Sequence, residues 1–130
     1  MNILLAEDDN FFQNFYAKKL SEQGITVTVA KDGEEALTAL QTIKPDLILL
    51  DLIMPKKDGF DVLTELAKSE QLKTIPVLVF STLGQEEDII KAKSLGAIDF
   101  VNKTFFDFDS LLLKIKTIAR KKPTLIQTNP

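Results

Sequence analysis

The sequence contains no cysteine and no histidine, and these two absences exclude several classes of site. Without cysteine the chain can form neither a disulfide framework nor a thiolate metal site, which permits a reducing compartment. Without histidine it has no imidazole base, no imidazole ligand for zinc and no side chain that can become phosphohistidine. The chemistry of this chain therefore depends on other side chains.

The sequence also lacks the marks of a secreted or membrane protein. No basic segment or small-residue cleavage site precedes the first apolar run, and no run approaches the roughly 20 apolar residues of a membrane span. The formal net charge of -3 gives no overall field that attracts nucleic acid, although Arg120, Lys121 and Lys122 form a local basic cluster. We expect a soluble cytoplasmic protein that contacts neither membrane nor nucleic acid directly.

The sequence does contain enough apolar material for one core. At 130 residues, with 45% hydrophobic residues and nine phenylalanines, the chain has the size of one domain. We expect this domain to cover residues 1–122. Residues 123–130 have no hydrophobic period and are expected to form a flexible C-terminal tail.

Short apolar runs alternate with longer segments of helical period, which is typical of βαβ units around a parallel sheet. The expected strands are residues 2–6, 25–30, 47–51, 77–81 and 98–101. The expected helices are residues 10–23, 33–42, 60–69, 85–95 and 107–122. The pattern therefore predicts five strand and helix pairs in an α/β fold.

Acidic side chains, a hydroxyl and an amine stand at or just past the ends of four expected strands. These residues are Glu7 and Asp8, then Asp51, Ser81 and Lys103. The carboxyl ends of parallel strands meet at one edge of the sheet, in the crevice where open α/β folds bind ligands. The sequence therefore predicts one pocket that holds three carboxylates and a lysine.

Clustered carboxylates raise one another's pKa values and destabilise a fold unless a cation neutralises them. Mg²⁺ suits this pocket, with Mn²⁺ as a substitute, because it binds carboxylate and carbonyl oxygens together with waters. We expect Asp8 and Asp51 as direct ligands and Glu7 acting through water. A carboxylate in such a site can also accept a phosphoryl group. Lys103 would then supply positive charge, and Ser81 a hydrogen bond, to the transferred phosphoryl oxygens.

The ordered set of motifs resembles the receiver domain of two-component response regulators. The matching segments are residues 3–9, residues 49–55 with Asp58-Gly59, residues 76–81 and residues 96–103. The resemblance extends over residues 2–122. It implies a single doubly wound, flavodoxin-like α/β domain with five parallel strands in the order 2-1-3-4-5 and five helices.

The resemblance implies a role for each residue of the pocket. It makes Asp51 the phosphoacceptor and Lys103 the amine that contacts the phosphoryl group. Glu7 and Asp8 correspond to the acidic pair that binds the metal, and Ile53 to the residue whose backbone carbonyl completes the metal site.

The resemblance also implies a phosphorylation-dependent signalling switch and not a turnover enzyme. A histidine kinase or histidine phosphotransfer protein would supply the phosphoryl group. Ser81 corresponds to the switch hydroxyl and Phe100 to the switch aromatic, which together reposition the face made by the fourth helix, fifth strand and fifth helix. That face would bind an unidentified output target or another copy of the chain in a phosphorylation-dependent homodimer.

The sequence departs from the family pattern in three respects. Thr104 stands where the family usually has a proline that follows a cis bond, and a cis bond before threonine costs roughly 2.5–4 kcal/mol. Phe100 lacks the hydroxyl of the common tyrosine. Ile53 and Leu83 occupy the two positions that tune dephosphorylation in the family, and neither side chain can orient a water. We therefore predict a long-lived phosphoryl group.

The first expected helix, residues 10–23, carries an apolar stripe that predicts its buried face. The stripe consists of Phe12, Phe15, Tyr16 and Leu20. Phe11 falls outside it, next to the acidic residues. We interpret Phe11 as an exposed residue of a docking surface for a phosphodonor protein.

Three other functions compete with the switch. A metal-dependent phosphatase that forms an aspartyl phosphate generally needs a second acid two residues after the nucleophile, where this chain has Ile53. A flavin carrier needs a hydroxyl- and glycine-rich phosphate loop after the first strand, where Glu7, Asp8 and Asp9 would repel the phosphate. A receiver fragment of a longer DNA-binding regulator also fits the sequence.

Overall fold

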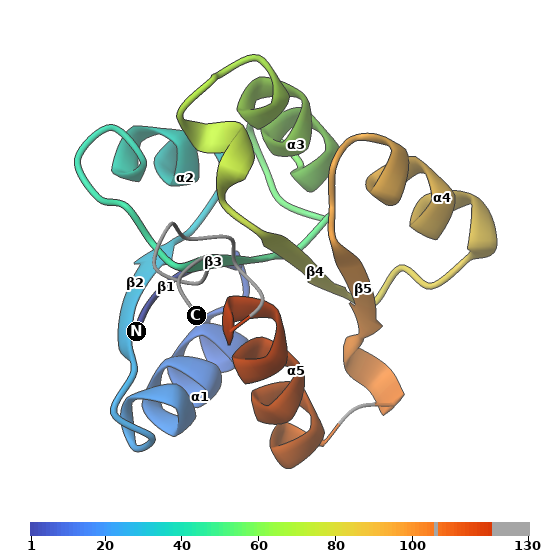
Figure 1. Cartoon of the computed structure of the whole chain (residues 1–130). Helices are drawn as coiled ribbons and strands as arrows, with labels where there is room; N and C mark the ends of the chain where they lie inside the picture. The colour runs from blue at the N-terminus through green and yellow to red at the C-terminus, as the bar shows by residue number, and fades with distance from the viewer. Residues whose placement is uncertain (106, 121–130) are drawn as a thin grey trace, which may run out of the picture.

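A parallel sheet lies between two layers of helices in the computed structural model, which describes residues 1–105 and 107–120 (Figure 1). The strands are β1 (Asn2–Ala6), β2 (Thr26–Ala30), β3 (Leu47–Leu50), β4 (Val77–Ser81) and β5 (Asp99–Asn102). The helices are α1 (Asn10–Ser21), α2 (Gly33–Ala39), α3 (Gly59–Ala67), α4 (Glu86–Ser94) and α5 (Phe108–Arg120). Two 3-10 helices are η1 (Leu72–Thr74) and η2 (Lys103–Phe105). The predicted tail at residues 123–130 lies outside the described residues.

The strand order is β2-β1-β3-β4-β5, and every neighbouring pair is parallel. Helices α1 and α5 cover one face of the sheet, and α2, α3 and α4 cover the other (Figure 1). The central strands β3 and β4 consist of buried residues throughout, because helices cover both of their faces. The predicted doubly wound fold with strand order 2-1-3-4-5 is confirmed.

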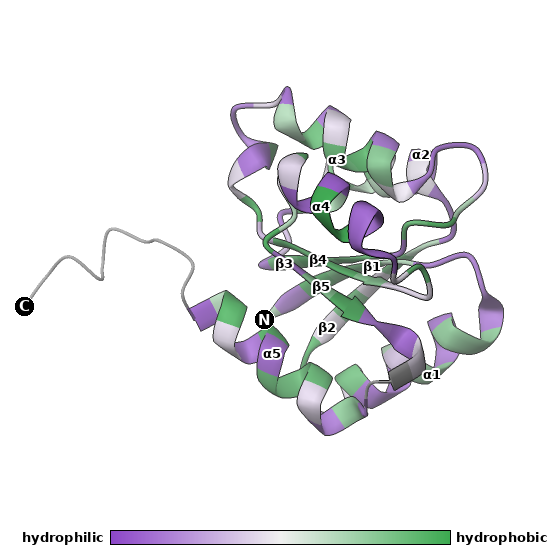
Figure 2. Ribbon diagram, turned by 90° about the vertical axis from the view of Figure 1, so that its right-hand side faces the viewer, coloured by the Kyte–Doolittle hydropathy of each residue, from purple (hydrophilic) through white to green (hydrophobic). Residues whose placement is uncertain are grey.

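The alternation of side chains along the strands divides the core into two clusters. Leu4 and Ile48 belong to the cluster on the side of α2, α3 and α4, whereas Ile3 and Leu49 belong to the cluster on the side of α1 and α5. Successive residues of a strand point to opposite faces, so one apolar run supplies both clusters. Figure 2 shows apolar strands between helices that carry both apolar and polar residues.

The helix boundaries follow from local chemistry. Asp9 caps α1 by accepting hydrogen bonds from the backbone N–H groups of Phe11 and Phe12. The helix predicted at residues 33–42 ends earlier, at Ala39, and a turn follows. The turn at residues 40–42 and Pro45 then separate α2 from β3.

Two further properties concern the described part of the chain only. None of its helices combines the length and the apolar character that a membrane crossing requires. No cis peptide bond occurs in it, so the bond between Lys103 and Thr104 is trans.

The buried face of α1 differs from the predicted stripe. Tyr16 and Leu20 are buried as expected, but Phe15 is 41% exposed, so its placement in the core was wrong. Gln13 is buried instead, and its side-chain amide donates a hydrogen bond to the backbone carbonyl of Glu7. A hydrogen bond makes the burial of a polar amide tolerable. Phe11 is exposed as predicted, and its ring stacks on that of Phe15 at 6.0 Å.

Lys56, in the loop between β3 and α3, has a φ of 68°, in the left-handed region that only glycine adopts without strain. Its ammonium lies 3.7 Å from a carboxylate oxygen of Asp32, but the lysine is so exposed that this pair contributes little. We expect Lys56→Gly to raise the free energy of unfolding by about 0.5–1 kcal/mol, measured by urea denaturation.

Lys57→Gly is the matched control because Lys57 has no positive φ. Glycine there adds chain entropy to the unfolded state without relieving strain, so it should lower the free energy of unfolding by about 0.5–1 kcal/mol. Equal losses in both variants would contradict the assignment of strain to Lys56.

Candidate functional site

The predicted site residues gather where β1, β3, β4 and β5 end. Parallel pairing aligns Ala6, the last residue of β1, with Leu50, the last residue of β3. Glu7 and Asp51 therefore follow neighbouring strands at the same level of the sheet. Lys103 directly follows β5 and reaches both carboxylates.

Glu7, Asp8 and Asp51 form an acidic cluster in which one carboxylate oxygen from each residue lies within 4.8 Å of the others. Glu7 and Asp51 are buried, the latter with 6% of its surface exposed, and Asp8 faces solvent. Oxygen donors at this spacing, with one side open to water, fit a hard cation such as Mg²⁺ or Mn²⁺. The donor set contains no nitrogen or sulfur that would favour zinc.

Lys103 is the cation within this cluster. Its Nζ donates one hydrogen bond to Glu7 and another to Oδ2 of Asp51 at 3.2 Å. Its side chain is only 3% exposed, so bulk water does not screen these two ion pairs. The lysine therefore offsets part of the acidic charge and is fixed in position beside Asp51.

The pKa of Glu7 reflects both its burial and the charges around it. Burial raises the pKa of Glu7 above its ordinary value of 4.5, and the negative charge of Asp51 adds to this rise. The hydrogen bond and the positive charge of Lys103 oppose it without cancelling it. The cluster therefore retains a deficit of positive charge, which a bound cation would remove.

The backbone fixes Asp51 from two sides. Its Oδ1 accepts a hydrogen bond from the backbone N–H of Ile53 at 3.2 Å, which orients the carboxylate toward Lys103. A Cβ at Gly59 would lie 2.5 Å from the backbone oxygen of Asp51, so glycine is the residue that lets α3 begin against this segment.

The predicted switch residues lie on the two strands beyond Asp51. Ser81 ends β4 and is fully buried, and its hydroxyl oxygen accepts a hydrogen bond from the backbone N–H of Leu83 at 3.3 Å. Phe100 lies on β5, half-buried, and packs against the core cluster on the side of α2, α3 and α4. Ser81 therefore ends the strand next to that of Asp51, and Phe100 lies on β5, one of the elements of the predicted readout face.

Comparisons with known proteins agree with this geometry. The family profile of the response regulator receiver domain matches residues 3–116. Response regulator RR06 of Streptococcus pneumoniae is 42% identical over 118 residues, which are 91% of this chain and 51% of the relative. The DNA-binding transcriptional regulator RpaA of Synechocystis is 34% identical over 125 residues, which are 96% of this chain and 52% of the relative. The chain spans about half the length of these curated relatives.

Solved structures show the same fold. The receiver domain of the Francisella response regulator 1452 has a TM-score of 0.86 and 33% identity, with 94% of this chain and 98% of that chain covered. The Mn²⁺-bound form of response regulator Rcp1 has a TM-score of 0.78 and 31% identity, with 95% and 97% covered.

Receiver domains are phosphorylated by histidine kinases and bind Mg²⁺ or Mn²⁺ at an acidic pocket. The family profile covers most of the chain, the strand order is that of the family, and the acidic cluster lies where the pocket is expected. The chain therefore belongs to the receiver domain family of two-component response regulators.

Proposed function

We propose that Asp51 accepts a phosphoryl group from a histidine kinase or histidine phosphotransfer protein in the cytoplasm. The single observation that supports this most is the buried ammonium of Lys103, held between Glu7 and Asp51 beside the exposed Asp8. An acceptor carboxylate, a fixed positive charge and a set of oxygen donors open to solvent are what phosphoryl transfer to a carboxylate requires.

Each residue has a distinct part in the proposed reaction. An oxygen of Asp51 attacks the phosphorus, and the bond from phosphorus to the donor breaks, so the leaving group keeps that electron pair. Lys103 provides positive charge to the equatorial oxygens, and the Ser81 hydroxyl donates a hydrogen bond to one of them. Glu7, Asp8, Asp51 and the backbone carbonyl of Ile53 would hold Mg²⁺ or Mn²⁺, which adds positive charge beside the same oxygens.

The experiment that tests this function is incubation with acetyl phosphate and Mg²⁺, followed by intact mass spectrometry. We expect one added phosphoryl group, and none when EDTA replaces Mg²⁺. No added mass in the presence of the metal would contradict the proposal. The chain is an acceptor that is regenerated only slowly, so a single addition per molecule and no rapid turnover of acetyl phosphate are expected.

A second candidate concerns the role of the domain in a longer protein. This chain spans about half of relatives such as RpaA, which is described as a DNA-binding transcriptional regulator. We propose that a receiver of this kind controls a DNA-binding output. The chain itself carries a net charge of -3 and is not expected to bind DNA. A shift of duplex DNA by the isolated chain in a gel assay would contradict the proposal that the receiver controls DNA binding without binding DNA itself.

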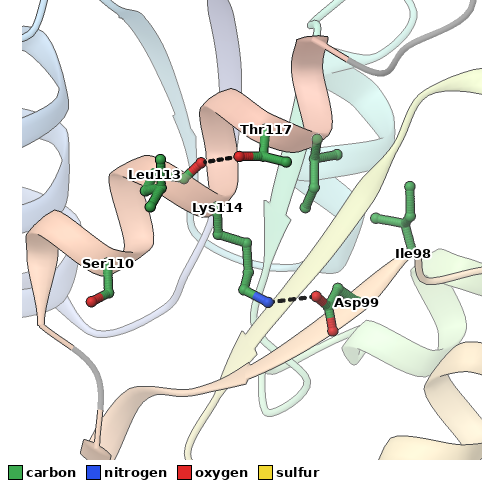
Figure 3. A pocket seen from close by; sticks show the side chains of 7 residues that line it. Ile98, Asp99, Ser110, Leu113, Lys114 and Thr117 are labelled. Carbon is green, nitrogen blue, oxygen red and sulfur yellow. Dashed lines mark hydrogen bonds and ion pairs between the residues drawn. The ribbon is translucent and has the colours of Figure 1, made fainter.

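The proposed readout face is that of α4, β5 and α5, which holds a groove between β5 and α5 (Figure 3). Lys114 of α5 donates a hydrogen bond across it to Asp99 of β5 at 2.6 Å. Burial alone would raise the pKa of Asp99, but the hydrogen bonds from Lys114 and the Phe100 backbone lower it overall. Asp99 therefore stays ionised at neutral pH.

We propose a second copy of the chain as the partner of this face. The lysines Lys93 and Lys114 flank the acidic Asp99, and the apolar Leu113 beside them is 68% exposed. A two-fold axis at Leu113 would pair the leucines of the two copies, with the charged residues at the edge of the contact. We propose that phosphorylation favours this homodimer.

Beryllium trifluoride, which mimics a phosphoryl group, is expected to convert the protein to a dimer in analytical ultracentrifugation. Leu113→Glu should weaken the dimer at least about tenfold, because it sets the carboxylates of the two copies opposite each other at the centre of the contact. Thr64→Glu, on the exposed side of α3, is the control and should dimerise normally. A protein that stays monomeric with the mimic would point to a different molecule as the target.

The phosphoryl group on Asp51 is proposed to be long-lived. Ile53 is half-exposed and Leu83 half-buried, and neither side chain can orient an attacking water. Ile53→Asn introduces an amide that can hold such a water and should shorten the half-life of the acyl phosphate at least about tenfold. Ile90→Asn, which alters another exposed isoleucine, is the control. Decay of the wild-type acyl phosphate within seconds would contradict this prediction.

A further inference from the structure

Two aromatic rings lie against the ammonium of Lys103 in addition to its carboxylate partners. The Nζ lies 4.7 Å from the ring centre of Phe12 and 5.7 Å from that of Phe80. Phe12 comes from α1, and Phe80 comes from β4. Both distances are within the range in which the negative face of a ring attracts a cation.

Tyr16 holds these two rings in place. Its ring meets that of Phe80 edge to face at 5.0 Å and 86°, and stacks on that of Phe12 at 6.1 Å and 19°. Phe80 and Tyr16 are buried in the core, and Phe12 packs against the same cluster. The rings that face Lys103 are therefore held in place by packing in the core.

The rings and the carboxylates support the lysine in different ways. Glu7 and Asp51 neutralise the ammonium, and both are proposed metal ligands, so a bound metal competes with Lys103 for them. A phenyl ring offers no oxygen to Mg²⁺ and carries no net charge. A bound metal would therefore not compete with Lys103 for the rings, and the rings do not neutralise the charge of Lys103.

Lysine is a flexible residue, so its charge has catalytic value only when its position is fixed. Its four rotatable bonds lose conformational entropy when one geometry is selected. A charge placed in advance stabilises the transition state without rearrangement at the moment of transfer. We propose that Phe12 and Phe80 are positioning residues that hold the Lys103 ammonium for the incoming phosphoryl oxygens, an inference that depends on the proposed function of Asp51.

Phe12 is the better position for a test, because it is half-buried, whereas Phe80 lies in the core, where truncation costs stability. Phe12→Leu keeps an apolar side chain and removes the ring face. A ring-fluorinated phenylalanine at position 12 keeps the shape and weakens the negative face. Phe60→Leu is the matched control, because it removes a ring that lies over a different lysine, Lys91, at 4.3 Å.

In Phe12→Leu the rate of phosphorylation by acetyl phosphate and the affinity for beryllium trifluoride should both fall about three- to tenfold. The fluorinated variant should show an intermediate loss. The Kd for Mg²⁺, measured by calorimetry, should change less than twofold in both variants. The side-chain protons of Lys103 should lose an upfield ring-current shift in NMR spectra of the unphosphorylated protein. Phe60→Leu should match the wild type in all of these measurements.

Normal rates and beryllium trifluoride affinity in Phe12→Leu would overturn the inference. A fluorinated variant as fast as the wild type would overturn it too, because packing alone would then explain the leucine variant. If the proposed function of Asp51 is wrong, the wild-type protein itself takes up no phosphoryl group. In that case the absence of a ring-current shift at Lys103 would separately refute the contact with the rings.

Discussion

Replacing Asp51 by asparagine is expected to abolish the incorporation of a phosphoryl group from acetyl phosphate. The neutral amide is a far weaker nucleophile than a carboxylate and cannot form the acyl phosphate. The protein is expected to stay folded, because asparagine has nearly the same shape and Lys103 keeps its hydrogen bond to Glu7. Intact mass spectrometry of both proteins under identical conditions should show the adduct only in the wild type.

Asp9→Asn is the matched control for this loss. Asp9 caps α1, and asparagine caps helices about as well as aspartate, so the fold should not change. Its carboxylate is not part of the acidic cluster around Lys103. The adduct should therefore persist in Asp9→Asn. An unchanged adduct in Asp51→Asn would assign the acceptor role to another carboxylate.

The strands were predictable from the sequence to within one residue at each end, because short apolar runs bounded by polar residues mark them. A run such as residues 47–50 can be buried only as a central strand or inside a helix, and Asp51 is the first polar residue after it. Parallel pairing then brings Asp51, Ser81 and Lys103 to one edge without any knowledge of side-chain contacts. Topology alone therefore predicts which of these residues lie at this edge of the sheet, whereas their roles stay predictions.

The contacts around Lys103 were not predictable in this way. Phe11, Phe12, Phe15 and Tyr16 are all aromatic, so hydropathy alone does not tell which way α1 is rotated. The packed structure decides, because a buried hydrogen bond from Gln13 to Glu7 fixes the helix and leaves Phe15 exposed. The approach of Phe12 and Phe80 to Lys103 depends on this rotation. The role of Phe11 in docking a phosphodonor stays a prediction.

Lys103→Met is expected to lower the free energy of unfolding by roughly 3–5 kcal/mol at neutral pH without metal. The substitution keeps much of the length of the side chain but removes the one cation between Glu7 and Asp51. Two buried carboxylates then remain without a counter-charge, next to Asp8. Urea denaturation in EDTA measures the loss. Phosphorylation should also slow by about 10²-fold or more, because the fixed positive charge is absent.

The destabilisation caused by Lys103→Met should be larger at neutral pH than at acidic pH. Lys103 lowers the pKa of Glu7, so its removal raises that already raised pKa further. A carboxyl group with a raised pKa in the folded state binds protons there more readily than in the unfolded chain, so its cost grows as the pH rises above 4.5. The difference between Lys103→Met and the wild type should therefore be largest at neutral pH and shrink toward pH 4.5. Mg²⁺ should also reduce it, because the metal replaces the missing charge.

Lys114→Met is the control for Lys103→Met, because it also removes a lysine that forms an ion pair. Lys114 pairs with Asp99 at 2.6 Å, but both side chains are about one-third exposed, so the variant should lose less than about 1 kcal/mol. Similar losses of unfolding free energy in the two variants would show that burial does not make the ion pairs of Lys103 more important than an exposed pair. A loss in Lys103→Met that does not shrink on acidification would show that it arises from packing, since only charged carboxylates make the missing ammonium costly.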